Sequence, residues 1–205
     1  MTALPTLADP TPAIIVDLRT ATARQHEALE SELALLDEPL SRERFVAALC
    51  GFLGFHQVWE PAIAATLGDA AGMAWRSRIE LLIQDLRALG CADDSIAAIR
   101  PCTDAAALVA SPAHAWGSLY VMEGSTLGGQ VISRRLRDVP WVPEHGLRYF
   151  DPYGQHTGAR WKETRAQLSA AGEQHDPAAI STAAVATFEL LRHWVATPTF
   201  AVSPA

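Results

Sequence analysis

Apolar residues recur every three or four positions along most of this chain, which is the spacing of amphipathic helices. Capping residues, prolines and glycines divide the pattern into segments. The helices that we expect span 11–30, 41–67, 72–89, 111–137, 157–170 and 176–195, with a short piece from 103. Pro61 is expected to kink the second helix. The strand-like alternation at 139–142 is interrupted by Pro140, so the sequence predicts an all-α bundle with any ligand site between helices.

Three glycines interrupt the helix expected at 111–137, namely Gly124, Gly128 and Gly129. Each interior glycine costs about 1 kcal/mol relative to alanine, so bare backbone at these positions needs a compensating gain. Gly124 and Gly128 stand one helical turn apart, and Gly129 widens the same strip. This helix can therefore bend and let a large flat ligand approach its main chain. Close helix–helix packing is the alternative explanation.

The first expected helix carries a histidine on its apolar side. His26 is followed one turn later by Glu30, whose carboxylate can accept the proton of the imidazole Nδ1. That arrangement leaves Nε2 free to bind a metal ion. A hydrogen-bonded core histidine is the structural alternative.

Composition limits the class of protein. The chain has 205 residues, of which 49% are hydrophobic, and we expect one domain over 1–205 with flexible tails at 1–11 and 197–205. The chain has three cysteines and no Cys-x-x-Cys motif, so the sequence indicates neither a disulfide framework nor a zinc ribbon. We therefore expect the protein in a reducing cytoplasm. We expect neither a signal peptide nor a membrane anchor. The formal charge of −7 argues against broad nucleic-acid binding.

Several segments together resemble the biliverdin-forming heme oxygenases, in particular the soluble bacterial kind that accompanies bacteriophytochromes. These segments are 18–30, the stretch 120–130 with its Glu-Gly-Ser-Thr-Leu-Gly-Gly core, Phe-Asp-Pro-Tyr-Gly at 150–154, and Trp161. The resemblance implies a helical bundle that holds heme b between a proximal helix and a kinked, glycine-rich distal helix. Heme would be both cofactor and substrate, and its cleavage by dioxygen would release biliverdin, carbon monoxide and ferrous iron.

The resemblance also implies roles for individual residues. His26, supported by Glu30, would be the proximal iron ligand, and the backbone of Gly124, Gly128 and Gly129 would approach the heme and the dioxygen. Water held near Ser125, Gly124 and Gly128 would supply protons. Ser125 stands where animal members of the family have an aspartate, and a hydroxyl cannot do all that a carboxylate does.

Heme propionates require cations or hydroxyls. Arg19 precedes His26 by two turns and lies about 10 Å from it along the helix axis, near where a propionate could reach. Lys162, Arg165 and Tyr120 are further candidates, although surface charges and a core tyrosine need no such role. The electron donor, such as a ferredoxin or flavoprotein reductase, could dock on the basic cluster Arg134, Arg135 and Arg137, which alternatively complements the helix dipole. A bacteriophytochrome is a candidate acceptor of biliverdin.

Two other functions remain open on the sequence. A non-catalytic heme or bilin carrier would share the binding site. A helical di-iron oxidase could use three His–Glu pairs spaced i,i+4, although the usual motif is Glu-x-x-His. The pairs are His26/Glu30, His56/Glu60 and Glu189/His193.

Overall fold

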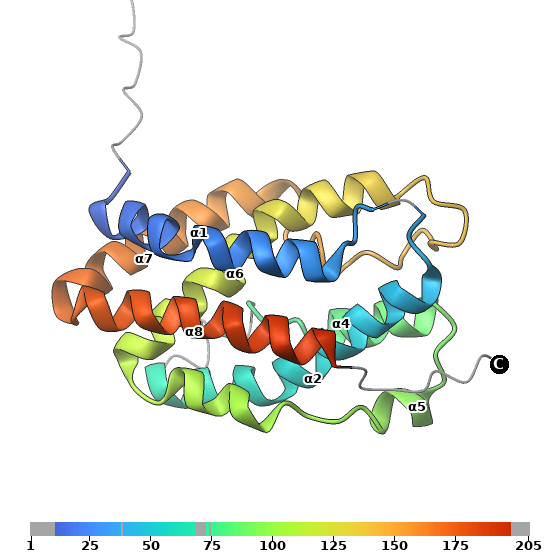
Figure 1. The fold of residues 1–205 in the computed structure, drawn as a ribbon, viewed down its shortest axis with the longest axis horizontal. Helices are drawn as coiled ribbons and strands as arrows, with labels where there is room; N and C mark the ends of the chain where they lie inside the picture. The colour runs from blue at the N-terminus through green and yellow to red at the C-terminus, as the bar shows by residue number, and fades with distance from the viewer. Residues whose placement is uncertain (1–10, 38, 69–72, 74, 198–205) are drawn as a thin grey trace, which may run out of the picture.

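The computed structural model describes residues 11–37, 39–68, 73 and 75–197, and these form an α-helical bundle (Figure 1). Its helices are α1 (Ala13–Leu33), α2 (Arg42–Leu67), α4 (Ile79–Ala88), α5 (Asp93–Ala97), α6 (Pro112–Leu136), α7 (Thr157–Gln174) and α8 (Pro177–Ala196), with short 3-10 helices η1 (Thr103–Val109) and η2 (Gly154–His156). The described residues contain no strand. The all-α expectation is therefore confirmed. Residues 1–10 and 198–205, which make up most of the two expected tails, lie outside the described residues.

Capping side chains begin three of the helices where the sequence indicates. The Ser41 hydroxyl accepts a hydrogen bond from the Arg44 N–H at 3.1 Å, and Asp176 accepts one from Ala178 at 3.0 Å. Ser111 caps α6 in the same way. Gly90 follows α4 with φ +81°, a left-handed conformation that favours glycine.

The helix expected at 72–89 is interrupted at 75–78, after the helical residue Met73. Trp75 to Arg78 are non-helical, and α4 begins only at Ile79. Buried carboxylates explain the difference, because the Arg78 N–H donates to Glu60 and its guanidinium pairs with Glu123. The sequence also misses α5, and it ends the first and seventh helices one turn too early.

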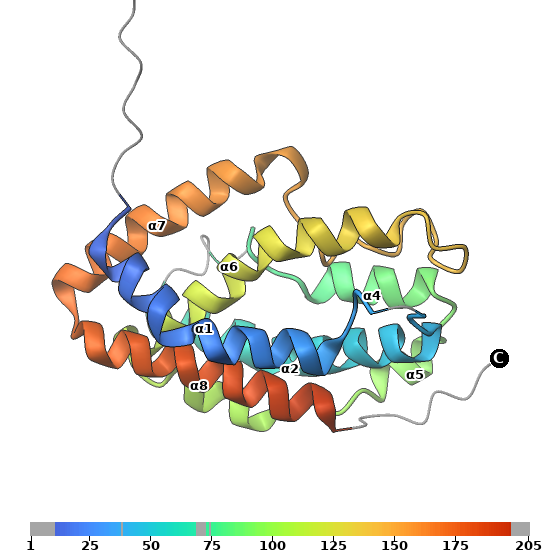
Figure 2. The same cartoon turned by 45° about the horizontal axis from the view of Figure 1, so that its top comes forward.

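Helix α2 lies inside the bundle and is buried on most of its surface, as its nearly continuous apolar sequence suggests. Phe45, Leu49, Leu53 and Ile63 on this helix are fully buried. Helix α8 packs against both α1 and α6, and Figure 2 shows the axes of α1, α2 and α8 roughly parallel below α6, with α2 running opposite to the other two. Helices α1 and α6 thereby flank one side of the core.

Candidate heme site between α1 and α6

A cavity of about 880 Å³, part of it open to solvent, lies between α1 and α6. Its wall is mostly apolar and includes Leu29 and Leu33 from α1, Phe52 from α2, and Ile132 from α6. The cavity lies between helices, which is where the sequence predicts a ligand site.

His26 lies on this cavity with its side chain half exposed. Its Nδ1 is 3.6 Å from Glu30 Oε2, slightly longer than a hydrogen bond, and its ring meets Phe188 edge-on at a centroid distance of 5.6 Å. Both Glu30 and Phe188 line the same cavity. The carboxylate next to Nδ1 favours a proton there, which leaves Nε2 available to a metal.

The three glycines of α6 have different surroundings. A Cβ added to Gly128 would meet no atom within 4 Å, and Gly128 lines the cavity. A Cβ on Gly124 would instead rest 3.7 Å from the Trp161 ring. A Cβ on Gly129 would collide with the carbonyl oxygen of Phe150. Gly128 thus presents open backbone to the cavity, whereas close packing explains Gly129, although Gly129 also borders the cavity.

Ser125 lines the cavity from α6, as expected for the position of the distal aspartate. Its hydroxyl donates a hydrogen bond to the Met122 carbonyl of its own helix at 2.8 Å. The proton of this hydroxyl is therefore already used, and the oxygen retains only its capacity to accept.

Among the residues that the structure describes, those expected to bind the propionates do not line the cavity. Arg19 and Lys162 are exposed, whereas Arg165 is half-buried. Tyr120 packs against Trp161 at a centroid distance of 6.0 Å. Burial raises the pKa of Tyr120, and the nearby charge of Arg19 opposes that rise. The structure thus brings Arg19 near Tyr120 but leaves their contact with heme as a prediction.

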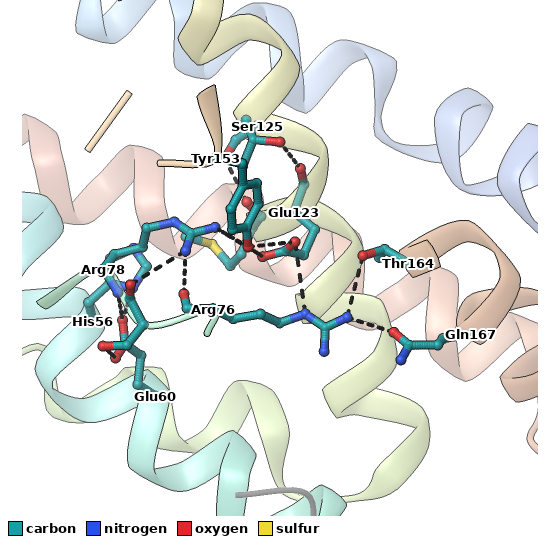
Figure 3. A network of polar contacts seen from close by, with 12 residues as sticks. His56, Glu60, Arg76, Arg78, Glu123, Ser125, Tyr153, Thr164 and Gln167 are labelled. Carbon is teal, nitrogen blue, oxygen red and sulfur yellow. Dashed lines mark hydrogen bonds and ion pairs between the residues drawn. The ribbon is translucent and has the colours of Figure 1, made fainter. Parts of the chain in front are cut away.

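A buried ionic cluster that the sequence did not predict borders the cavity (Figure 3). Glu123 lies 3.2 Å from the Arg78 guanidinium and 3.8 Å from that of Arg76, and it accepts a hydrogen bond from the Tyr153 hydroxyl at 3.0 Å. Burial raises the pKa of Glu123, and the two arginines oppose the rise. Arg76 also donates to Gln167 on α7 at 2.6 Å. Glu123 stands inside the Glu-Gly-Ser motif, but no local signal shows that the arginines would reach it.

A second polar group on the cavity comes from α2. His56 Nδ1 lies 2.9 Å from Glu60 Oε1, and both residues are buried. The three His–Glu pairs considered for a di-iron site do not converge. His193 bonds the Glu189 backbone carbonyl, and the described residues hold no group of three or more His, Cys, Asp or Glu side chains that could bind a metal ion. The described geometry therefore gives no basis for the di-iron alternative.

Residues 13–197 match the family model described as heme oxygenase. The chain belongs to the heme oxygenase family. It is 36% identical over 115 residues to a heme oxygenase of Xanthomonas campestris pv. campestris (strain 8004), an alignment that covers 56% of this chain and 63% of that relative. Its fold is also similar to the crystal structure of heme oxygenase 2 from Chlamydomonas reinhardtii without heme, with a TM-score of 0.67 and 18% identity over 94% of this chain and 100% of that one.

Family membership fits what the geometry places on the cavity. The all-α architecture of the chain matches that of the structural neighbour. No helix among the described residues is long and apolar enough to cross a membrane.

Proposed function

We propose that this protein degrades heme b with dioxygen and an external electron donor, releasing biliverdin, carbon monoxide and ferrous iron. The observation that carries the proposal is that His26 and Gly128 line the same cavity, so an imidazole side chain faces the same space as a bare stretch of helix backbone. Bound heme would supply the iron that activates dioxygen and the porphyrin that is oxidised.

The protein's part in this reaction is to hold and orient the heme. We propose that His26 Nε2 is the iron ligand. Glu30 lies next to Nδ1 and favours the proton on that nitrogen, so the lone pair of Nε2 is available to the iron. The side chains of Phe52, Phe150 and Ile132 give the ring an apolar wall that excludes water. Gly128 gives room on the other wall, where any side chain would occupy the space of the ring or of dioxygen.

We also propose that Arg19, Tyr120, Lys162 and Arg165 contact the heme propionates, although they lie beyond the cavity wall. The proposal rests on the family resemblance and on the proximity of Arg19 to Tyr120. Charge reversal at Arg19 is expected to change heme affinity or the cleaved meso carbon, and product analysis of the biliverdin isomer would reveal either effect.

A ferredoxin or a flavoprotein reductase is the proposed electron donor. The exposed Arg134 and Arg135 follow two exposed apolar side chains on the same outer stripe of α6, Leu127 and Val131, each 42% exposed. This basic and apolar stripe borders the cavity, because Gly128 and Ile132 line it from the next positions of the helix. It is suited to an acidic protein. A bacteriophytochrome remains our proposal for the acceptor of biliverdin.

The test is a spectroscopic turnover assay. One equivalent of hemin is added to the purified protein, followed by ascorbate and an iron chelator under air. The expected result is a Soret band that decays while the red absorption of biliverdin grows. A Soret band that forms and persists would instead identify a heme carrier, and a protein that binds no hemin would refute the proposal.

A further inference from the structure

The His56 side chain has one ring nitrogen that nothing in the fold accounts for. The residue is 1% exposed, lines the cavity, and packs edge-on against Trp59 and Tyr149 at centroid distances of 5.8 and 5.7 Å. Its Nε2 is buried and has no hydrogen-bond partner among the described residues. A buried polar atom left unsatisfied costs about 1–3 kcal/mol, so its retention points to a ligand group in the cavity.

The other ring nitrogen is fixed by a chain of hydrogen bonds (Figure 3). Glu60 accepts from His56 Nδ1 at 2.9 Å, from the Arg78 N–H at 2.7 Å and from the Ser77 hydroxyl at 2.6 Å. Burial alone would raise the pKa of Glu60, but these donors outweigh it and lower that pKa. An ionised carboxylate can only accept, so Nδ1 must carry the proton.

The imidazole is therefore neutral and of one tautomer. Burial lowers the pKa of His56 more than the adjacent Glu60 raises it, and the charge of Arg78 lowers it further. Among the described residues, Glu60 and Arg78 are the charged groups that shift this pKa. Nε2 consequently presents a lone pair, which accepts a hydrogen bond but does not donate one.

Ser125 and His56 thus offer two acceptors on the same cavity, one from α6 and one from α2. The Ser125 hydroxyl donates its hydrogen bond to the Met122 carbonyl, so toward the cavity it can only accept one. A water that donates one proton to Nε2 keeps the second proton for a group beside it.

We infer that His56 is a positioning residue for the proposed reaction, whose Nε2 accepts a hydrogen bond from the water that protonates bound dioxygen. The inference rests on the proposed heme breakdown, and it assigns to α2 the role that a hydroxyl at position 125 cannot fill alone. Glu60 acts behind the ring, where it fixes the tautomer and the orientation.

The first measurement needs no heme. Nitrogen NMR of apo-protein labelled at histidine is expected to show His56 neutral at pH 7, with the proton on Nδ1 and none on Nε2. A protonated Nε2 at pH 7 would overturn the inference, because a donor cannot hold the water in this orientation.

The second measurement compares two variants. His56→Phe fills the site but removes Nε2, whereas His56→Gln keeps an acceptor oxygen near the same place. Loss of one hydrogen bond, worth about 0.5–1.5 kcal/mol, predicts that ascorbate-driven turnover falls roughly two- to tenfold in the Phe variant. The Gln variant is expected to stay within about twofold of wild type, and both variants should bind hemin nearly as tightly as wild type. Apo-protein melts establish that both fold.

The outcomes separate the inference from the function that it rests on. Turnover of His56→Phe at the wild-type rate overturns the role of His56 while heme breakdown stands. A wild-type spectrum of two axial histidines that is lost in His56→Phe would make His56 an iron ligand and also overturns it. If wild-type protein binds hemin without degrading it, the proposed function fails first, whatever the tautomer.

Discussion

Gly128 and Gly129 are neighbours in sequence, yet one faces open space and the other faces backbone. A Cβ on Gly128 would meet nothing within 4 Å, whereas a Cβ on Gly129 would collide with the Phe150 carbonyl. The 100° that separates successive helical residues puts Gly129 against a packed segment and Gly128 toward the cavity. The two positions therefore form a matched pair for separating ligand contact from packing.

Gly128→Leu is expected to leave the apo-protein as stable as wild type or up to about 1 kcal/mol more stable, because leucine is the better helix former. The new side chain enters the cavity, so hemin affinity or turnover should fall. Thermal melts of the apo-protein combined with hemin titration measure both effects. A variant that is destabilised but still binds and degrades heme normally would remove Gly128 from the site.

Gly129→Ala is expected to destabilise the apo-protein by about 1–3 kcal/mol, because its methyl group forces α6 away from Phe150. Urea unfolding gives the free energy directly. Gly124→Ala is the control, since its methyl group would only make ordinary contact with Trp161 at 3.7 Å. Equal stability of the two variants would contradict the close approach at Gly129.

His26→Ala should lose the axial-ligand spectrum of the hemin complex and its turnover, because the side chain is the proposed iron ligand on the cavity. His193→Ala makes the same change at an exposed histidine whose Nδ1 bonds its own helix, and it should behave as wild type. Absorption spectra of both complexes give the comparison. An unchanged spectrum and biliverdin yield in His26→Ala would end the assignment.

Reversing charge with Arg134→Glu and Arg135→Glu should slow turnover driven by an acidic [2Fe–2S] ferredoxin and its reductase by about tenfold at low salt. Screening should shrink the difference at about 1 M salt, where the Debye length is about 3 Å. Ascorbate-driven turnover of the same variant is the control and should not change. Equal ferredoxin-driven rates would place the donor elsewhere.

The His56–Glu60 pair predicts that the free energy of unfolding decreases as the pH falls below 6.5, the ordinary pKa of histidine. In that range the unfolded chain takes up a proton at His56 that the folded protein does not, so acid favours unfolding. His56→Phe removes this contribution and should flatten the dependence between about pH 6.5 and 5. Urea unfolding at pH 7.5 and 5.5 tests this, and identical slopes in both proteins would contradict it.

The sequence predicted most of the fold because helix signals are local. The caps at Ser41, Ser111 and Asp176 are hydrogen bonds that span two or three residues. The apolar periodicity of a helix is likewise contained within the sequence of that one helix. The proximity of His26 to Glu30 follows from the same helical geometry. The helix predicted across 75–78 was wrong because carboxylates that lie far away in the chain hold these residues in a non-helical conformation.

What the sequence by itself determined is the set of helices, the unusual glycine strip, and the histidine that shares a helix side with a carboxylate. Only the tertiary structure decided which glycine faces the cavity, since Phe150 and Trp161 come from later segments. It alone placed Arg76 and Arg78 against Glu123 and turned His56 toward the cavity. Burial and ionic pairing depend on which distant segments pack together, and that information does not reside in any local pattern.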